Sequence, residues 1–433
     1  MNLSRLFAGH LFWRGAYVLT SVGVTILMAR YLQAATTGWV FYFISWLSFA
    51  LLVAIAGMDA GATYFVSGGR IKAERMESFA LVWTAVTAVV GGMVSCFFTI
   101  RGVAAINSHL LVAFALFFIC GNILISFFNA LYYARRDFIT PNIIFTCTNI
   151  ALCLWLLAGL FGLTITPAGF SFLEVYFFSF LLQGLLVWLL YRLRQPRLLY
   201  WYWIKMQDVK QLLRYSGWAF GANLFFFIVT RIDYWLIAAY VADPDGLGNY
   251  IQASRLVQLF QMLPAVLAAA VFPLAAGEWK QQMQLRIATL SRIIIAGYSV
   301  IIVLLVLFGR MLFPFVFGAS FQAMYAYFLL LIPGLLALTA LSLISAYLAA
   351  INQVRYNLLG AMIAAIAIFV SGCWLIPQYG IKAAGLISSM GYILCFAVGA
   401  YFFRRHTGIA WWKFFVWQKT DAAFIKQVLQ QIK

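Results

Sequence analysis

The sequence predicts an all-α polytopic membrane protein with about twelve transmembrane helices. Of its 433 residues, 65% are hydrophobic and 9% are charged, and its mean hydropathy is +0.96. Soluble domains are roughly 45 to 50% apolar and about 25% charged. The apolar runs reach about 20 residues or more, the length that a helix needs to cross a bilayer, and they lack the alternating segments of about ten residues found in spanning β-barrels.

Apolar runs bounded by charge, glycine or proline mark the expected spans. The first run holds Arg14 and no small-residue cleavage site, which favours a retained span over a signal peptide. The link before the seventh span reads LLYWYWIKMQDVKQLL, which is typical of an interfacial amphipathic segment. The twelve spans are 9–32, 38–66, 79–100, 108–133, 142–163, 168–191, 215–241, 247–275, 290–309, 324–350, 356–377 and 381–403.

The positive charge follows the expected topology. If both termini are cytoplasmic, most of the 29 basic residues lie on the inner side, and only Arg101, Arg310 and Lys382 lie in outer loops. This asymmetry is the positive-inside pattern of multi-pass membrane proteins. The net charge of +18 therefore indicates topology and contact with anionic membrane lipids, and we expect no nucleic-acid partner.

A short repeat indicates two halves. ARYLQAATTGWV (29–40) and AAYVADPDGLGNY (238–250) share Ala-x-Tyr, and Gly38 and Gly248 follow their tyrosines by seven and eight residues. The repeat recurs after six spans in the same orientation, which predicts two parallel six-helix lobes, as in many secondary transporters. The expected organisation is an N-terminal lobe at 1–192, a cytoplasmic interfacial linker at 193–214, a C-terminal lobe at 215–404 and a cytoplasmic amphipathic tail at 405–433.

The tail is expected to form a short helix on the inner leaflet, or a frayed terminus. Its apolar residues recur at helical spacing after a cap at Thr420 or Asp421. They are Phe424, Ile425, Val428, Leu429 and Ile432.

Catalytic and metal sites find little support. The six cysteines lie inside apolar runs without paired spacing, which argues against disulfides and metal ligation. The outer loops are short and nearly uncharged, the three histidines form no constellation, and HExxH, GxSxG and P-loop patterns are absent from the sequence. We therefore expect a protein that is not an enzyme and that has no catalytic residues, no cofactor and no metal.

Charged residues inside the spans are the candidate site, because burying them in a membrane is costly. Gln252, Arg255, Gln258 and Gln261 recur every three residues as a polar stripe that is expected to line a cavity or a helix contact. The candidate substrate-binding residues are Arg14, Arg30, Arg231, Arg255, Gln252 and Gln258. The candidates for ion coupling or ion pairing are Asp59 and Asp233.

Several of these charges have alternative interpretations. Arg30 lies near the outer end of its span, where it could reach the interface. Arg14 and Asp59 are predicted to lie at similar depth, where they either form an ion pair or line a cavity.

In the second half, Asp233 and Arg255 are equidistant from the turn at 241–247, which predicts an ion pair about 10 Å below the outer surface. Residues two apart on a helix point about 200° from each other, so Arg231 and Asp233 should not pair. Arg231 is then available to an anion, and guanidinium is suited to bidentate contact with phosphate.

Four segments resemble those of polysaccharide flippases of the Wzx type, in the superfamily that includes MATE exporters and lipid II flippases. They are ILMARYLQ, AGMDAGATYFVS, DVKQLLRYSGWAFGANLFFFIVTRIDYWLIAAYV and GLGNYIQASRL. The resemblance implies two six-helix lobes in an inverted V around a central cationic cavity. It also implies translocation of undecaprenyl-diphosphate-linked, O-antigen-like oligosaccharide units across the bacterial inner membrane by alternating access.

Further expectations follow from this resemblance. The substrate is an anionic lipid-linked glycan, and a polysaccharide polymerase and glycosyltransferases are expected partners. Separately from the resemblance, Asp59 and Asp233 are acids inside the spans, which makes them candidates to bind a coupling proton or sodium ion. A MATE-type exporter of cationic drugs is the main alternative, although it would require an excess of acidic cavity residues. A membrane-embedded enzyme of glycan assembly is the third hypothesis.

Overall fold

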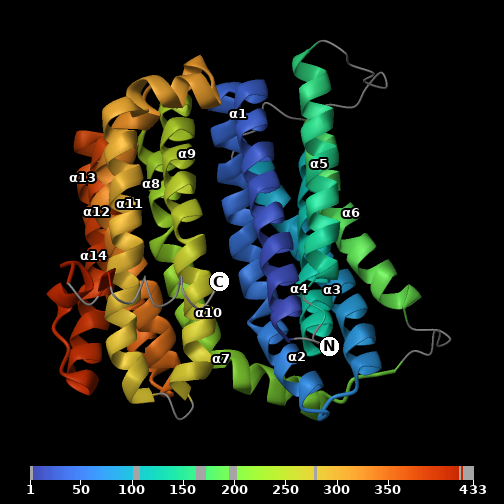
Figure 1. Cartoon of the computed structure of the whole chain (residues 1–433). Helices are drawn as coiled ribbons and strands as arrows, with labels where there is room; N and C mark the ends of the chain where they lie inside the picture. Colours follow the sequence, from blue (N-terminus) through green and yellow to red (C-terminus); the bar gives the residue numbers. More distant parts are fainter. Residues whose placement is uncertain are drawn as a thin grey trace. The chain divides into compact units, whose positions relative to one another are not determined.

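The computed structural model describes residues 3–100, 108–135, 137, 139–161, 172–194, 202–276, 280–418 and 421–422. These residues form α-helices and two short 3-10 helices, without any strand, so the predicted all-α class is confirmed (Figure 1). The helices are α1 (Leu3–Ile55), α2 (Met58–Ser67), α3 (Ala73–Ile100), α4 (Ser108–Ala134), α5 (Thr140–Leu160), α6 (Phe172–Leu193), α7 (Met206–Val229), α8 (Ile232–Tyr240), α9 (Pro244–Phe260), α10 (Met262–Ala276), α11 (Lys280–Phe317), η1 (Ala319–Phe321), α12 (Met324–Ala350), α13 (Val354–Tyr379), α14 (Ile381–Thr407) and η2 (Trp411–Phe414).

Helix α1 contains two membrane spans. Its apolar part, Phe12–Ile55, has 44 residues. At 1.5 Å per residue this is about 66 Å, roughly twice the thickness of a hydrocarbon core. The backbone of Gln33 interrupts the helix at φ 62° and ψ 177°. This kink separates the two spans that the sequence predicts on either side of residues 33–37.

Three expected spans are not continuous helices, which corrects the prediction for 38–66, 215–241 and 247–275. Ala56 and Gly57, with φ of 48° and 72°, separate α1 from α2. Thr230 and Arg231 separate α7 from α8, and Gln261 separates α9 from α10.

The third break has a visible cause in Pro264. A proline has no N–H to donate to the carbonyl four residues earlier, which here belongs to Phe260. The Tyr298 hydroxyl donates to that carbonyl instead. A side chain from α11 thus satisfies the group that the proline leaves without its helical donor.

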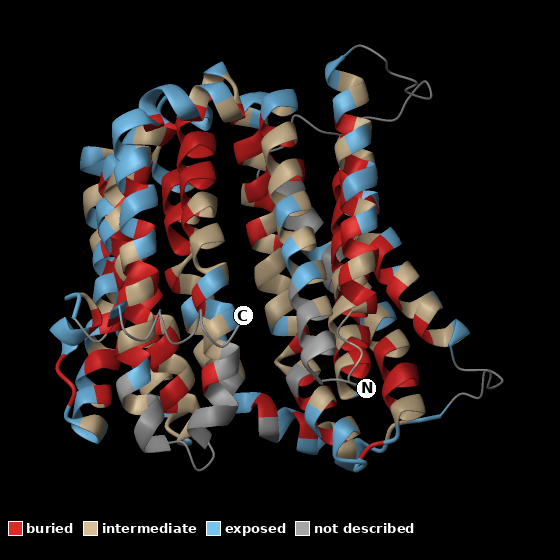
Figure 2. Cartoon of the chain, in the orientation of Figure 1, coloured by how far each residue is buried: buried red, intermediate tan, exposed pale blue. Residues whose placement is uncertain are grey.

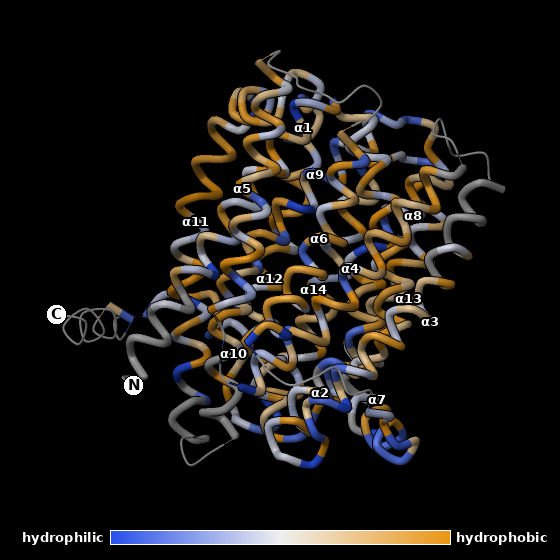
Figure 3. The backbone as a smooth tube through the Cα atoms, turned by 90° about the vertical axis from the view of Figure 1, so that its right-hand side faces the viewer, coloured by the Kyte–Doolittle hydropathy of each residue, from blue (hydrophilic) through white to orange (hydrophobic). Residues whose placement is uncertain are grey.

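Nine helices in the described part of the chain are long and apolar enough to cross a membrane. Helix α1 counts once among them although its kink divides it. Helices α9 and α10 have 17 and 15 residues and are each too short to be counted alone. Hydrophilic residues gather at the ends of helices, most visibly around α2 and α7 (Figure 3).

The chain divides into two compact units. Unit 1 comprises Met1–Leu32 and Phe43–Phe220, and unit 2 comprises Gln33–Tyr42 and Gly221–Lys433. The expected lobe limits at 192 and 215 remain a prediction. Residues 206–214, expected in the linker, form the first turns of α7. Of the expected tail helix, only Asp421 and Ala422 are described, and its apolar residues lie outside the described part.

Unit 1 is built on the close approach of α4 and α6. A Cβ on Gly121 would overlap the backbone of Phe180, and a Cβ on Gly184 would overlap the backbone of Gly121. The rings of Phe114 and Phe177 stack beside this contact, with centroids 4.6 Å apart. Small residues thus allow these two helices to pack backbone to backbone, as is common in membranes.

Unit 2 is built around α12, which packs against α14, α10, α9 and α11. The N-terminal half of α9 is mostly buried (Figure 2). Residues 33–42 of α1 also belong to this unit. There Gly38 lies against the backbone of Gly248, and a Cβ on Gly248 would overlap the carbonyl oxygen of Ala34. The two glycines that mark the sequence repeat are therefore in contact, and neither position has room for a side chain.

Candidate functional site

The candidate site in unit 2 begins at the break between α7 and α8, which holds Arg231. Its Nη1 donates to the Tyr234 hydroxyl at 2.8 Å, and its Nη2 donates to Oε1 of Gln258 at 2.8 Å. Both acceptors are neutral. The side chain is partly exposed, and it forms no ion pair with any described residue. Arg231 therefore presents a positive charge that no carboxylate of the described chain neutralises by direct contact.

Asp233 lies two residues further on and is 1% exposed. Its Oδ2 accepts hydrogen bonds from the Tyr250 hydroxyl at 2.5 Å and the Ser388 hydroxyl at 2.8 Å. Its Oδ1 accepts from the backbone N–H of Tyr234 at 2.9 Å. The carboxyl group therefore joins α8, α9 and α14 inside unit 2.

The predicted ion pair between Asp233 and Arg255 is wrong. Arg255 instead places its guanidinium 3.6 Å from the centroid of the Phe41 ring, a cation–π contact. The hairpin does bring α8 and α9 together, but Tyr250 is the residue that faces Asp233. Arg255 lies five positions beyond Tyr250, so its side chain points about 140° away from that of Tyr250 on the helix. Equal distance from the turn therefore does not identify the partner of Asp233.

The polar stripe on α9 contacts neighbouring helices. Gln258 accepts from Arg231 and lies 3.4 Å from the Tyr234 hydroxyl. Gln261 donates to the Leu335 carbonyl at 3.3 Å and accepts from the Ser342 hydroxyl at 3.3 Å, both on α12. Gln252 is 2% exposed, and its buried Oε1 has no hydrogen-bond partner among the described residues.

The candidates in unit 1 do not form one cluster. Arg14 lies over the Tyr17 ring at 5.4 Å, a cation–π contact, and its role as an ion-pair partner of Asp59 or as a cavity residue stays a prediction. The prediction that Arg14 and Asp59 lie at similar depth assumes that the second span is one continuous helix. Asp59 follows the break at Gly57, in the first turn of α2, so this assumption does not hold. Arg30 is exposed.

Some polar residues that hold the charged groups or join helices are uncharged, and charge within the spans does not identify them. Tyr250 and Ser388, which hold Asp233, look like ordinary span residues in the sequence. In unit 1, Asn149 donates to the Ser21 hydroxyl at 2.9 Å and accepts from Gln183 at 3.4 Å. Amide and hydroxyl groups inside apolar runs were the available signal, but such groups also occur in ordinary helix contacts.

In the described part of the chain, no group of three or more His, Cys, Asp or Glu residues could hold a metal ion. The site therefore consists of a cation, a buried carboxyl and neutral hydrogen-bonding groups.

The sequence matches no protein-family model and no curated protein. Solved structures are similar in fold. An inward-facing multidrug resistance MATE family transporter of the MOP superfamily has a TM-score of 0.69 at 14% identity, covering 90% of this chain and 94% of that chain. The lipid II flippase MurJ in an inward closed conformation has a TM-score of 0.66 at 14% identity, covering 92% and 86%.

A MOP superfamily transporter from Pyrococcus furiosus has a TM-score of 0.66 at 13% identity, covering 94% of this chain and 95% of that chain. For that protein, a reversed polarity of the binding pocket suggests a different function. The shared fold over nearly the whole length establishes that this chain has the fold of MATE transporters and MurJ.

Proposed function

We propose that the protein is a flippase that moves undecaprenyl-diphosphate-linked oligosaccharide units across the bacterial inner membrane by alternating access. The observation that carries the proposal is Arg231, whose guanidinium lies at a helix break and donates hydrogen bonds to two neutral oxygen atoms, with no acceptor carboxylate among the described residues. The likeness of the fold to transporters, one of them a lipid II flippase, supports membrane transport as the general activity.

The chemistry of Arg231 favours an anionic cargo. An arginine stays charged at physiological pH, and its planar donors match two phosphate oxygens at once. Tyr234 and Gln258 orient the guanidinium without neutralising it. A diphosphate could therefore gain a charge-assisted contact there without first displacing a bound carboxylate.

Export of a cationic drug is the second candidate function, because MATE transporters share the fold. It would need a carboxylate that is accessible to a cation the size of a drug molecule. Asp233 is buried, and it accepts three hydrogen bonds within unit 2. The arrangement around Arg231 and Asp233 thus favours an anion over a cation as cargo.

Coupling to protons or sodium belongs to the same proposal, with Asp233 or Asp59 as the coupling residue. Around Asp233, the carboxylate and the hydroxyls of Tyr250 and Ser388 supply oxygen atoms, the ligand type preferred by hard cations. Glycosyltransferases that build the glycan and a polysaccharide polymerase that extends it are the proposed partners.

Complementation of glycan surface display in a bacterium that lacks its own flippase tests the proposal. We expect Arg231→Ala to abolish display at a normal protein level, and Arg231→Lys to retain part of it, because lysine keeps the charge but loses the planar donors. Arg310→Ala, which changes an exposed arginine on α11, is the matched control and should behave as wild type. Full display with Arg231→Ala would refute the anion site.

A further inference from the structure

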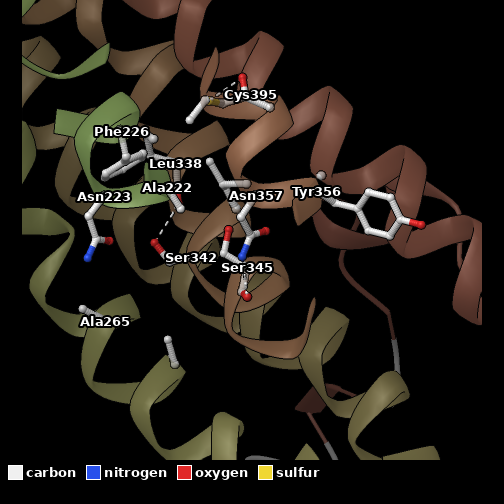
Figure 4. Close-up of a pocket in the computed structure, with 15 residues that line it drawn as sticks. Ala222, Asn223, Phe226, Ala265, Leu338, Ser342, Ser345, Tyr356, Asn357 and Cys395 are labelled. Carbon is white, nitrogen blue, oxygen red and sulfur yellow. Dashed lines mark hydrogen bonds between the residues drawn. The ribbon is translucent and has the colours of Figure 1, made fainter. Parts of the chain in front are cut away.

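Unit 2 contains a cavity of about 330 Å³ that the charged site does not use (Figure 4). Helices α7, α10, α12, α13 and α14 form its walls. Its lining residues are Ala222, Asn223, Phe226, Ala265, Ala268, Leu338, Leu341, Ser342, Ser345, Tyr356, Asn357, Gly360, Ala361, Cys395 and Gly399. The small side chains of its alanines and glycines leave this space open. None of the lining residues is an acid, a lysine, an arginine or a histidine.

The polar groups of this cavity are neutral hydrogen-bonding groups. Asn223, Ser342, Ser345 and Asn357 surround the hollow (Figure 4). The amide nitrogen of Asn357 donates to the Ser345 carbonyl at 3.0 Å. Its Oδ1 is buried and has no hydrogen-bond partner among the described residues. An acceptor left in this state costs free energy that a ligand hydroxyl or amide would recover.

An aromatic ring completes the lining. Phe226 of α7 is 42% exposed although it belongs to a helix of the bundle, and it lines this cavity. Small-molecule sites combine apolar or aromatic walls with a few placed polar groups, and they measure about 300 to 1,000 Å³. The volume of this cavity is at the low end of that range, which favours a ligand group with a single ring over a whole oligosaccharide.

The cavity is connected to Arg231 by the stripe on α9. Arg231 donates to Gln258, and Gln261 follows three residues later, just beyond the C-terminal end of α9. Gln261 accepts from Ser342, whose side chain lines the cavity. On α7, the backbone N–H of Thr230, next to Arg231, donates to the carbonyl of the cavity residue Phe226 at 3.1 Å.

We propose that this cavity binds the first sugar of the lipid-linked cargo, the neutral ring attached directly to the diphosphate. A sugar offers hydroxyl donors to Asn357 and an apolar ring face to Phe226, and it carries no charge that the lining would have to neutralise. The inference rests on the proposed function, because the diphosphate at Arg231 identifies which sugar lies one helical turn away.

Binding by the purified full chain in lipid nanodiscs tests the inference with two separate probes. The first is a set of methyl glycosides of glucose, galactose, N-acetylglucosamine and N-acetylgalactosamine, observed by saturation-transfer NMR. The second is farnesyl diphosphate, measured by calorimetry. Ser345→Leu fills the cavity, and Ser371→Leu is its control, because the Ser371 hydroxyl donates to the carbonyls of Ala367 and Ile368 in its own helix and does not line the cavity. Phe226→Leu is a second variant that keeps the cavity apolar but removes the ring.

We expect at least one glycoside to bind, and its signal to fall at least fivefold in Ser345→Leu and Phe226→Leu but not in Ser371→Leu. Arg231→Ala should keep glycoside binding and weaken farnesyl diphosphate at least tenfold. Absence of glycoside binding, or binding unchanged by both cavity variants, would overturn this inference. Farnesyl diphosphate binding unchanged by Arg231→Ala would overturn the proposed function, so the two failures are distinguishable.

Discussion

Replacing Tyr250 by phenylalanine should destabilise unit 2 more than an ordinary lost hydrogen bond does. The Tyr250 hydroxyl donates to Oδ2 of Asp233 at 2.5 Å, the short distance typical of a charge-assisted O–H···O contact. Hydrogen bonds to charged groups contribute about 1.5 to 3 kcal/mol, and neutral ones about 0.5 to 1.5 kcal/mol. We therefore expect Tyr250→Phe to cost about 2 kcal/mol, which is roughly a 30-fold change in the unfolding equilibrium.

The matched control is Tyr347→Phe in the same unit. Tyr347 is fully buried, and its hydroxyl accepts from the neutral amide of Gln284 at 2.8 Å. Its loss should cost about 1 kcal/mol. Denaturant titration in detergent micelles, followed by intrinsic fluorescence, gives both free energies from the midpoint and slope.

A double-mutant cycle isolates the contact. With Asp233→Asn in the background, the cost of Tyr250→Phe should fall to about 1 kcal/mol, because the acceptor is then neutral. The reasoning is refuted if Tyr250→Phe costs no more than Tyr347→Phe, or if Asp233→Asn leaves its cost unchanged.

Three further predictions concern packing, the tail and coupling. Gly248→Ala should lower the free energy of unfolding by about 1 to 3 kcal/mol in the same titration, because its Cβ would overlap the Ala34 carbonyl. The control Gly297→Ala, with open space around its Cβ, should be neutral or stabilising. Equal costs for the two variants would contradict the steric argument. Asp421 pairs with Arg292 at 2.6 Å with side chains 0% and 4% exposed, so Asp421→Ala should cost about 3 kcal/mol at pH 7. Burial acts to raise the pKa of the Asp421 carboxyl, but the hydrogen bonds from Arg292 and the Gln418 backbone hold that pKa below its ordinary value. The contribution of Asp421 should therefore be constant above about pH 5 and decline below about pH 4 as the carboxyl is protonated, which titrations of wild type and variant across pH 3 to 7 would check. Asp233→Asn should abolish the dependence of transport on a proton or sodium gradient in vesicles, and an unchanged gradient dependence would remove Asp233 as the coupling residue.

The fold class could be predicted because the length and polarity of apolar runs reflect the thickness of the bilayer. The breaks inside spans could not be predicted as readily. The kink at Gln33 occurs at a residue with no special preference for its conformation. The end of α9 at Phe260 has a local signal in Pro264, but the hydroxyl that satisfies the Phe260 carbonyl comes from Tyr298 on a distant helix. Long-range partners such as this one are absent from local sequence patterns.

The site was predicted only in part for a related physical reason. Charge inside an apolar run is conspicuous, so Arg231 and Asp233 stand out from the sequence alone. Distance from a hairpin turn gives the depth of a side chain but not its direction, so it predicts Arg255 as the partner of Asp233 and does not identify Tyr250. The sequence repeat marks Gly38 and Gly248 as equivalent positions, but it does not predict that they are in direct contact.

The most direct test of the account measures translocation itself. Purified protein is reconstituted in liposomes that contain a fluorescently labelled prenyl-diphosphate oligosaccharide, and a membrane-impermeant quencher reports how much label remains in the outer leaflet. We predict that wild-type protein moves the label across the bilayer, that Arg231→Lys does so slowly, and that Arg231→Ala does not. Translocation by Arg231→Ala at the wild-type rate, or wild-type vesicles that move a cationic dye but not the oligosaccharide, would contradict the account.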